Sequence, residues 1–157
     1  MGNYLYGQRN GKGKIYYEEY LIYIGEFKNG KLNGEVKEYH IDSNLKFEGM
    51  YLYGKKRKGK EYFNGYLEYE GEYLYDKKWD GKGYDKNGNI IYELNNGNGK
   101  VKEYNNGKLE YEGEYLNGKK NGKGKKYSIL DGKLEYEGEY LNGKKMEKEK
   151  NILLMVN

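Results

Sequence analysis

Few side chains in this sequence could carry out chemistry. It contains one histidine (His40), two serines (Ser43 and Ser128), and no cysteine or threonine. A Ser–His–acid triad would have to use His40, and the residues around it do not form a nucleophile elbow. A zinc site needs several His or Cys ligands, which a single histidine does not supply. Neither kind of site is expected.

Carboxylate pairs such as Glu112 and Glu114 are the remaining catalytic candidates, because two acidic side chains can hydrolyse glycosides. Equivalent pairs recur at several other places in the chain, which indicates repetition of a sequence unit and not one active site. We therefore predict that the protein is not an enzyme, has no catalytic residues, and uses no metal or other cofactor.

Basic side chains form a second candidate site. They recur at equivalent places in the chain, where we expect them to align as a basic ridge: Lys55, Lys56, Arg57, Lys58, Lys77, Lys78, Lys119, Lys120, Lys144 and Lys145. Such a ridge would bind anionic phospholipid headgroups. Nucleic acid is disfavoured, because neighbouring glutamates dilute the positive field. The alternative is that these lysines are solvated and protect the sheet edges from aggregation.

Aromatic side chains form a third candidate. Tyr73, Tyr115 and Tyr140 recur at one position of the repeated unit and would be either core or a protein-binding face. Tyr53 and Tyr75 stand where other copies have Asn, so they are better candidates for an exposed contact. Trp79 is a residue type typical of binding hot spots, although it would equally fill a distorted turn.

The composition indicates what kind of hydrophobic core supports these sites. The chain has 157 residues, 29 basic and 25 acidic, with a net charge of +4. Aliphatic residues are scarce, whereas 22 residues are tyrosine, and each ring can bury roughly 150–250 Å². No apolar run approaches the roughly 20 residues of a membrane span, and no signal peptide is recognisable. We expect a cytoplasmic protein, with a peripheral position on a membrane or the cytoskeleton left open.

The elements that position these residues come from a repeat of about 21 to 25 residues. The clearest copy runs from Tyr111 to Tyr127, and others open at Tyr23, Phe47, Tyr69 and Tyr136. A shortened copy around residue 95 lacks its loop. We expect a partial repeat or cap over residues 1–22, repeats over 23–145, and a separate tail over 146–157.

Each unit is predicted to be a β-hairpin. Asn-Gly occurs eleven times, and both residues tolerate the positive φ of a type I′ turn. Between the turns, residues alternate with a period of two, so Tyr111, Gly113 and Tyr115 share one face of a strand. Glycine is costly in strands, and its regular recurrence indicates that aromatic rings lie flat over the glycine backbone.

Neighbouring hairpins must pair, because a lone hairpin is marginal in water. The predicted fold class is therefore all-β: an elongated, single-layer antiparallel β-meander of about six to seven stacked hairpins, with each unit contacting only its neighbours.

The unit Tyr-Glu-Gly-Glu-Tyr-Leu-Asn-Gly-Lys-Lys-Asn-Gly-Lys-Gly over 111–124 resembles the MORN (membrane occupation and recognition nexus) repeat. The segment over 106–113 is also similar to the YwqK-type variant of bacterial antitoxins. Tyr often replaces the Trp of the family, and Asp76 replaces a turn glycine. The resemblance implies a scaffold that binds partner proteins along a groove or at its ends, and that is also proposed to bind phospholipids.

The tail departs from the repeat at Met146 and ends in the most apolar run of the chain. Its oligomerisation candidates are Ile152, Leu153, Leu154, Met155 and Val156. An open-ended repeat array needs a cap, so the tail would either fold over the last unit or mediate an end-to-end homodimer.

Three functions follow. The first is a non-enzymatic scaffold that binds another protein through an aromatic groove or through its ends. The second is peripheral binding to an anionic membrane through the basic ridge. The third, which depends on the YwqK likeness, is an antitoxin-like neutralising partner.

Overall fold

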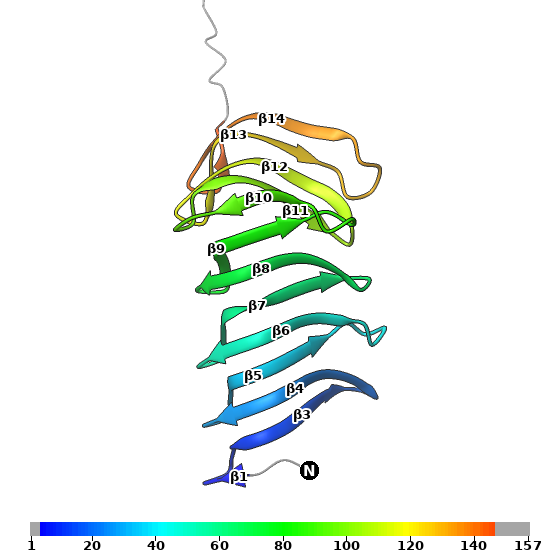
Figure 1. Ribbon diagram of the computed structural model, residues 1–157, viewed down its shortest axis with the longest axis vertical. Helices are drawn as coiled ribbons and strands as arrows, with labels where there is room; N and C mark the ends of the chain where they lie inside the picture. Colours follow the sequence, from blue (N-terminus) through cyan, green and yellow to red (C-terminus); the bar gives the residue numbers. More distant parts are fainter. Residues whose placement is uncertain (1–3, 147–157) are drawn as a thin grey trace, which may run out of the picture.

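The computed structural model describes residues 4–146, and in this range it is all-β, with no helix. The fifteen strands are β1 (Tyr4–Leu5), β2 (Gln8–Arg9), β3 (Gly11–Tyr17), β4 (Tyr20–Lys28), β5 (Lys31–Tyr39), β6 (Leu45–Leu52), β7 (Lys55–Phe63), β8 (Tyr66–Leu74), β9 (Lys77–Tyr84), β10 (Ile90–Leu94), β11 (Gly99–Asn105), β12 (Lys108–Leu116), β13 (Lys119–Tyr127), β14 (Leu134–Leu141) and β15 (Lys144–Lys145). Each strand pairs antiparallel with a sequence neighbour, and Figure 1 shows the resulting ladder of hairpins. The predicted fold class is confirmed.

The connections divide between two edges. The turn edge carries two-residue turns at 6–7, 29–30, 53–54, 75–76, 96–97, 117–118 and 142–143. The opposite loop edge carries turns or longer loops at 18–19, 40–44, 64–65, 85–89, 106–107 and 128–133. In the turn Asn117-Gly118 the φ angles are 51° and 70°, as a type I′ turn requires.

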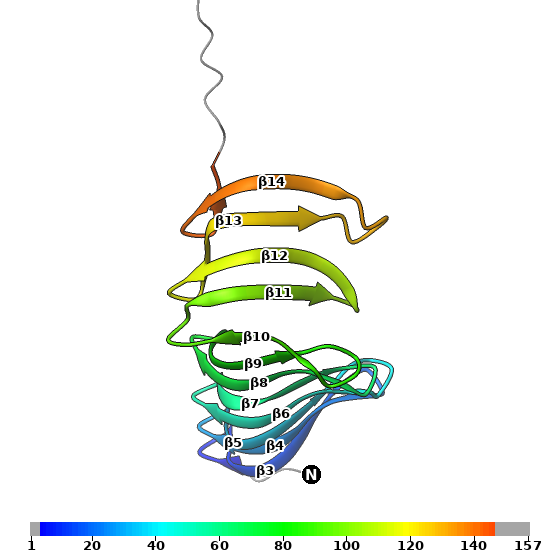
Figure 2. The same ribbon diagram turned by 45° about the horizontal axis from the view of Figure 1, so that its top comes forward.

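The ladder is not one continuous sheet. Strands β3 to β10 form an eight-stranded sheet and β11 to β15 a five-stranded one, and β10 and β11 share a single bridge, Asn95–Asn98. The second sheet is turned relative to the first: Figure 2 shows β11 to β14 spread apart where β3 to β9 overlap. The break falls at the shortened repeat, after the five-residue strand β10.

The core is a row of rings on one face of the sheets, the ring face. Phe47, Tyr69 and Tyr111 are fully buried. The Tyr111 ring covers the cross-strand pair Gly113 and Gly124, and a Cβ added at Gly124 would lie 2.6 Å from the Tyr111 hydroxyl. Rings therefore lie over glycine backbone as the glycine spacing predicts. Neighbouring rings meet edge to face, as Tyr69 and Tyr73 do at 5.5 Å between centroids.

Candidate functional site

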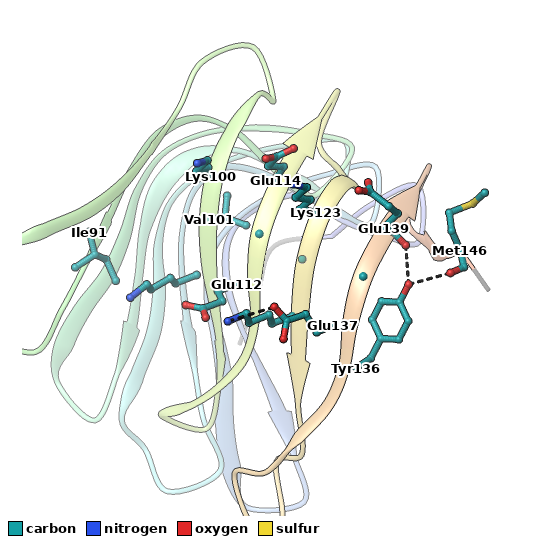
Figure 3. A pocket seen from close by; sticks show the side chains of 15 residues that line it. Ile91, Lys100, Val101, Glu112, Glu114, Lys123, Tyr136, Glu137, Glu139 and Met146 are labelled. Carbon is teal, nitrogen blue, oxygen red and sulfur yellow. Dashed lines mark hydrogen bonds and ion pairs between the residues drawn. The ribbon is translucent and has the colours of Figure 1, made fainter. Parts of the chain in front are cut away.

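The face opposite the rings is hollowed into a groove, the groove face. Over the second sheet this groove has a volume of about 1020 Å³. Val101, Gly113, Gly124 and Gly138 are directly cross-strand partners, and they form its floor. Figure 3 shows charged side chains on both sides of this floor. The Cβ positions of Gly113 and Gly124 point to the ring face, toward Tyr111, so the floor of the groove is glycine backbone and its walls are the charged side chains of the flanking residues.

The walls of the groove alternate in charge from strand to strand. Glu112 pairs with Lys125, and Lys125 pairs with Glu137 at 3.6 Å between Nζ and Oε1. The next row places Lys123 opposite Glu139. Because these side chains are exposed, the ion pairs contribute little to stability, about 0–1 kcal/mol each. They remain available to exchange partners with a bound segment.

One wall position is held more firmly. The hydroxyl of Tyr127 donates a 2.7 Å hydrogen bond to Glu112, and Tyr62 holds Glu48 at 2.8 Å in the first sheet. Burial and this hydrogen bond raise the pKa of Tyr62 to about 12. Two of the groove-face glutamates are thus fixed by a tyrosine of the returning strand.

The same face of the first sheet carries a second groove of about 610 Å³. Its floor contains Gly25, Val36, Gly49 and Gly59, which are again cross-strand partners. Its walls again alternate, for example with Lys37 and Glu48 at 3.4 Å. The repeat therefore builds the same groove in both sheets.

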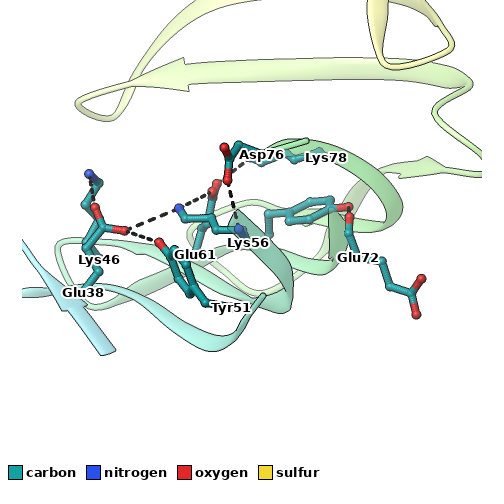
Figure 4. Close-up of polar contacts among 9 residues, drawn as sticks. Glu38, Lys46, Tyr51, Lys56, Glu61, Glu72, Asp76 and Lys78 are labelled. Carbon is teal, nitrogen blue, oxygen red and sulfur yellow. Dashed lines mark hydrogen bonds and ion pairs between the residues drawn. The ribbon is translucent and has the colours of Figure 1, made fainter. Parts of the chain in front are cut away.

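The ring face is covered by a network of charged side chains. Lys56 lies 4.3 Å from the centre of the Phe47 ring, and its ammonium contacts both Glu38 (3.6 Å) and Glu61 (3.3 Å). Lys78 reaches Glu61 at 3.0 Å. Figure 4 shows Lys56 between the carboxylates of Glu38 and Glu61. Ammonium groups above ring faces are favourable, and more so when water is excluded.

The pKa shifts follow from this pairing. Burial alone would raise the pKa of Glu61, but the ammonium groups of Lys78 and Lys56 bring it below its usual range. Burial would lower the pKa of Lys78, but the Glu61 carboxylate raises it above its usual range. Both groups are therefore charged at neutral pH, and each depends on the other.

The predicted basic ridge divides into two sets. Lys56, Lys78, Lys120 and Lys145, the second lysine of each pair, lie over the rings of Phe47, Tyr69, Tyr111 and Tyr136 respectively. The first lysines, together with Arg57 and Lys58 of strand β7, are exposed: Lys55, Arg57, Lys58, Lys77, Lys119 and Lys144. Only the second set is free to contact a membrane, although Lys55 also pairs with Asp76 at 2.6 Å.

The predicted aromatic contacts divide in the same way. Tyr73 and Tyr140 are buried in the core, and Tyr115 is half-buried with its hydroxyl bonded to Glu103. Tyr53 and Tyr75 are exposed at the tips of their turns, each with a φ of 51°. A bulky residue in this left-handed region is strained. Tyrosine is therefore less favourable than Asn at these two adjacent turns.

Trp79 is half-buried at the junction of the two sheets. Its carbonyl accepts a hydrogen bond from the Gly97 amide, and its ring packs against the turns at Gly97 and Gly118. Trp79 therefore fills the break between the sheets.

Sequence reasoning missed two features of this surface. The open groove is floored by glycine and not by the aromatic rings. A row of exposed leucines also follows the turn edge, at the last strand position before four of its seven turns: Leu5, Leu52, Leu116 and Leu141. The regular glycines were the available signal for the groove, but they do not say which face of the sheet curves inward.

Three further kinds of site were considered: an oligomerisation run, a metal site and a membrane span. The proposed oligomerisation run over 152–156 lies outside the described residues. Within residues 4–146, no group of three or more His, Cys, Asp or Glu side chains could hold a metal ion. Over the same range, no helix suited to crossing a membrane is found.

The fold and groove define a β-hairpin repeat protein without a metal cluster in its described part. The model of the MORN repeat family matches the sequence at residues 1–20, 23–35, 111–128 and 136–148. The chain thus contains MORN repeats in these four segments, and strands β6 to β9 continue the same hairpin architecture between them. No curated protein matches the sequence. The YwqK likeness, and with it the antitoxin role, stays a prediction.

Proposed function

We propose that this protein is a non-enzymatic, cytoplasmic scaffold that binds a partner protein in the glycine-floored groove. The observation that carries the proposal is the repetition of this groove, about 1020 Å³ over one sheet and 610 Å³ over the other. Pre-formed clefts of this size are typical of binding sites. MORN repeats are a non-catalytic repeat family, which supports the same function.

The floor and walls of the groove would contribute differently. The glycine backbone at the floor offers contact area, and the buried rings beneath keep this floor rigid. Alternating Glu and Lys at the walls would select a segment with complementary charges and fix its register. A rigid floor also lowers the entropic cost of binding.

The proposal predicts photo-crosslinking from the groove. A photoreactive amino acid placed at Lys123 or Lys58, both of which line the groove, should give a discrete crosslinked partner in lysate of the source cells. Introducing Lys125→Glu should reduce the adduct severalfold, because it places three acidic side chains side by side in the wall. Mass spectrometry of the adduct identifies the partner.

The matched control is the same photoreactive residue at Lys133, an exposed loop lysine whose side chain is 82% accessible. An equal yield of adduct from Lys133 and Lys123 would mean that the groove is not the binding surface. So would a yield that Lys125→Glu does not reduce.

The turn edge favours a second candidate, peripheral binding to an anionic membrane. The exposed leucine row lies beside the exposed lysines Lys55, Lys77, Lys119 and Lys144. Apolar residues beside basic ones are what an anionic lipid surface binds, at about 1 kcal/mol per basic residue.

This candidate predicts co-sedimentation with anionic vesicles that salt abolishes. Changing Lys55, Lys77, Lys119 and Lys144 to Glu should weaken vesicle binding by at least about a hundredfold, given about 1 kcal/mol per lost lysine. A control with equal charge changes Lys12, Lys37, Lys60 and Lys125, which lie on the groove face. If both variants lose binding equally, net charge and not the turn edge is responsible.

A further inference from the structure

The two sheets approach each other at the loop edge and enclose a cavity there. Phe63, the last residue of β7, packs its ring against the turn glycine Gly107 of the second sheet. The cavity beside this contact has a volume of about 310 Å³. It lies between the turn at 64–65, the loop at 85–89 and the turn at 106–107. It is thus separate from both grooves and exists because the sheet breaks after β10.

Four aromatic rings line this cavity: Phe63, Tyr66, Tyr84 and Tyr104. Tyr66 is 51% and Tyr104 40% exposed, so their rings are accessible from solvent. They are not members of the buried core row. A ring-lined cavity of this volume is at the lower limit for ligand pockets, so it fits one side chain and not a folded segment.

Glu68 gives the cavity its charge. It is half-buried and lines both this cavity and the adjoining one of about 480 Å³ between the sheets. Within residues 4–146 its carboxylate has no ion pair within 4 Å and no hydrogen bond. The ammonium of Lys78, whose charge acts on Glu68, is bonded to Glu61 at 3.0 Å. Burial raises the pKa of Glu68, as expected for a carboxyl group without a close cation.

The second carboxylate that lines the cavity already accepts hydrogen bonds from its own loop. Asp85 accepts hydrogen bonds from the backbone amides of Asn87 and Asn89, both at 2.9 Å, and from the Asn89 side chain at 3.0 Å. It therefore shapes the loop. Lys86 also lines the cavity but is exposed, without an ion pair to Glu68. Glu68 is thus the acceptor that is available to a ligand.

We infer that this cavity is a binding site for an arginine side chain of a partner protein, held between the rings and the Glu68 carboxylate. A planar guanidinium stacks on aromatic faces and also binds a carboxylate through its N–H groups. Arginine is enriched among the residues that dominate binding energy at interfaces. The inference builds on the proposed scaffold function and adds a second contact, away from the groove.

The test uses the full chain and a small probe, N-acetyl-arginine-methylamide, followed by NMR chemical-shift titration. The probe should shift the signals of Tyr66 and Tyr104, and Glu68→Gln should weaken its binding at least tenfold. The neutral isostere N-acetyl-citrulline-methylamide should bind at least tenfold more weakly than arginine. The matched control Glu70→Gln removes an exposed glutamate paired with Lys60 and should leave binding unchanged.

Equal binding of citrulline and arginine, or unchanged binding in Glu68→Gln, would overturn the inference. Binding of choline in place of arginine would also overturn it, in favour of a lipid headgroup. If Glu68→Gln fails to fold, Tyr66→Ala at the exposed ring replaces it and should weaken binding severalfold. The groove crosslinks are independent of this site, so failure here leaves the proposed scaffold function standing.

Discussion

Replacing Gly124 by alanine should destabilise the protein by about 3 kcal/mol, because the new methyl group overpacks a fully buried site. A Cβ at this position would lie 2.6 to 2.9 Å from three atoms of the Tyr111 side chain, its hydroxyl oxygen and two ring carbons. Tyr111 is fully buried and has no room to move aside. For a chain of this size, the melting temperature should fall by roughly 6–12 °C. Thermal and urea unfolding measure both quantities.

Two controls separate the steric effect from the general cost of replacing glycine. Gly132 has a φ of +73° and nothing within 4 Å of an added Cβ, so Gly132→Ala should cost only about 1 kcal/mol of backbone strain. Tyr111→Leu removes the ring and should reduce the cost of Gly124→Ala when the two changes are combined. An equal cost of Gly124→Ala with and without the ring would contradict this explanation of the repeat.

Glu61→Gln should destabilise the protein by about 2 kcal/mol, since it leaves two ammonium groups without their shared counter-ion. The estimate is below that for a fully buried pair because the side chains of Glu61 and Lys78 are 24% and 32% accessible. Lys56 keeps Glu38 as a partner at 3.6 Å, so most of the loss should come from Lys78. Urea unfolding at neutral pH measures the difference.

The same variant predicts a pH dependence. The folded protein holds the pKa of Glu61 below its usual range, and the unfolded value is about 4.3. Its stabilising contribution is therefore complete above pH of about 4.3 and is lost as the pH falls through the folded pKa. Glu61→Gln should remove this part of the acid dependence, whereas Glu70→Gln, an exposed groove-face control, should retain it. Parallel acid-unfolding curves for wild type and Glu61→Gln would contradict the assignment.

Local rules were enough to predict the repeating architecture. Asn117-Gly118 specifies its turn because both residues accept a positive φ. The period of two places Tyr111 and Gly113 on one face, so the packing of rings on glycine could also be foreseen. These features depend on residues adjacent in sequence or directly paired across strands.

Features that depend on register could not be predicted in this way. The ladder between β12 and β13 shifts after Gly113, so that Tyr115 pairs with Lys120. This shift moves Lys120 along the strand to the Tyr111 ring, and Lys119, which points to the other face, stays exposed. Neighbouring lysines that look alike in sequence thus have opposite surroundings, and the exposed set contains six of the ten basic residues that the sequence predicts for the ridge.

The hairpin repeat, its turns and its ring-on-glycine core follow from the residues of one unit, because turn chemistry and strand alternation act over a few residues. Three further features arise only when the strands of different units stack. Curvature placed the groove on the face opposite the rings, strand register placed Glu61 between two lysines, and the break at the shortened repeat brought Phe63 to Gly107 around Glu68. Each of these depends on how strands from different repeats stack, which is a sum of small twists and shifts that no single repeat encodes.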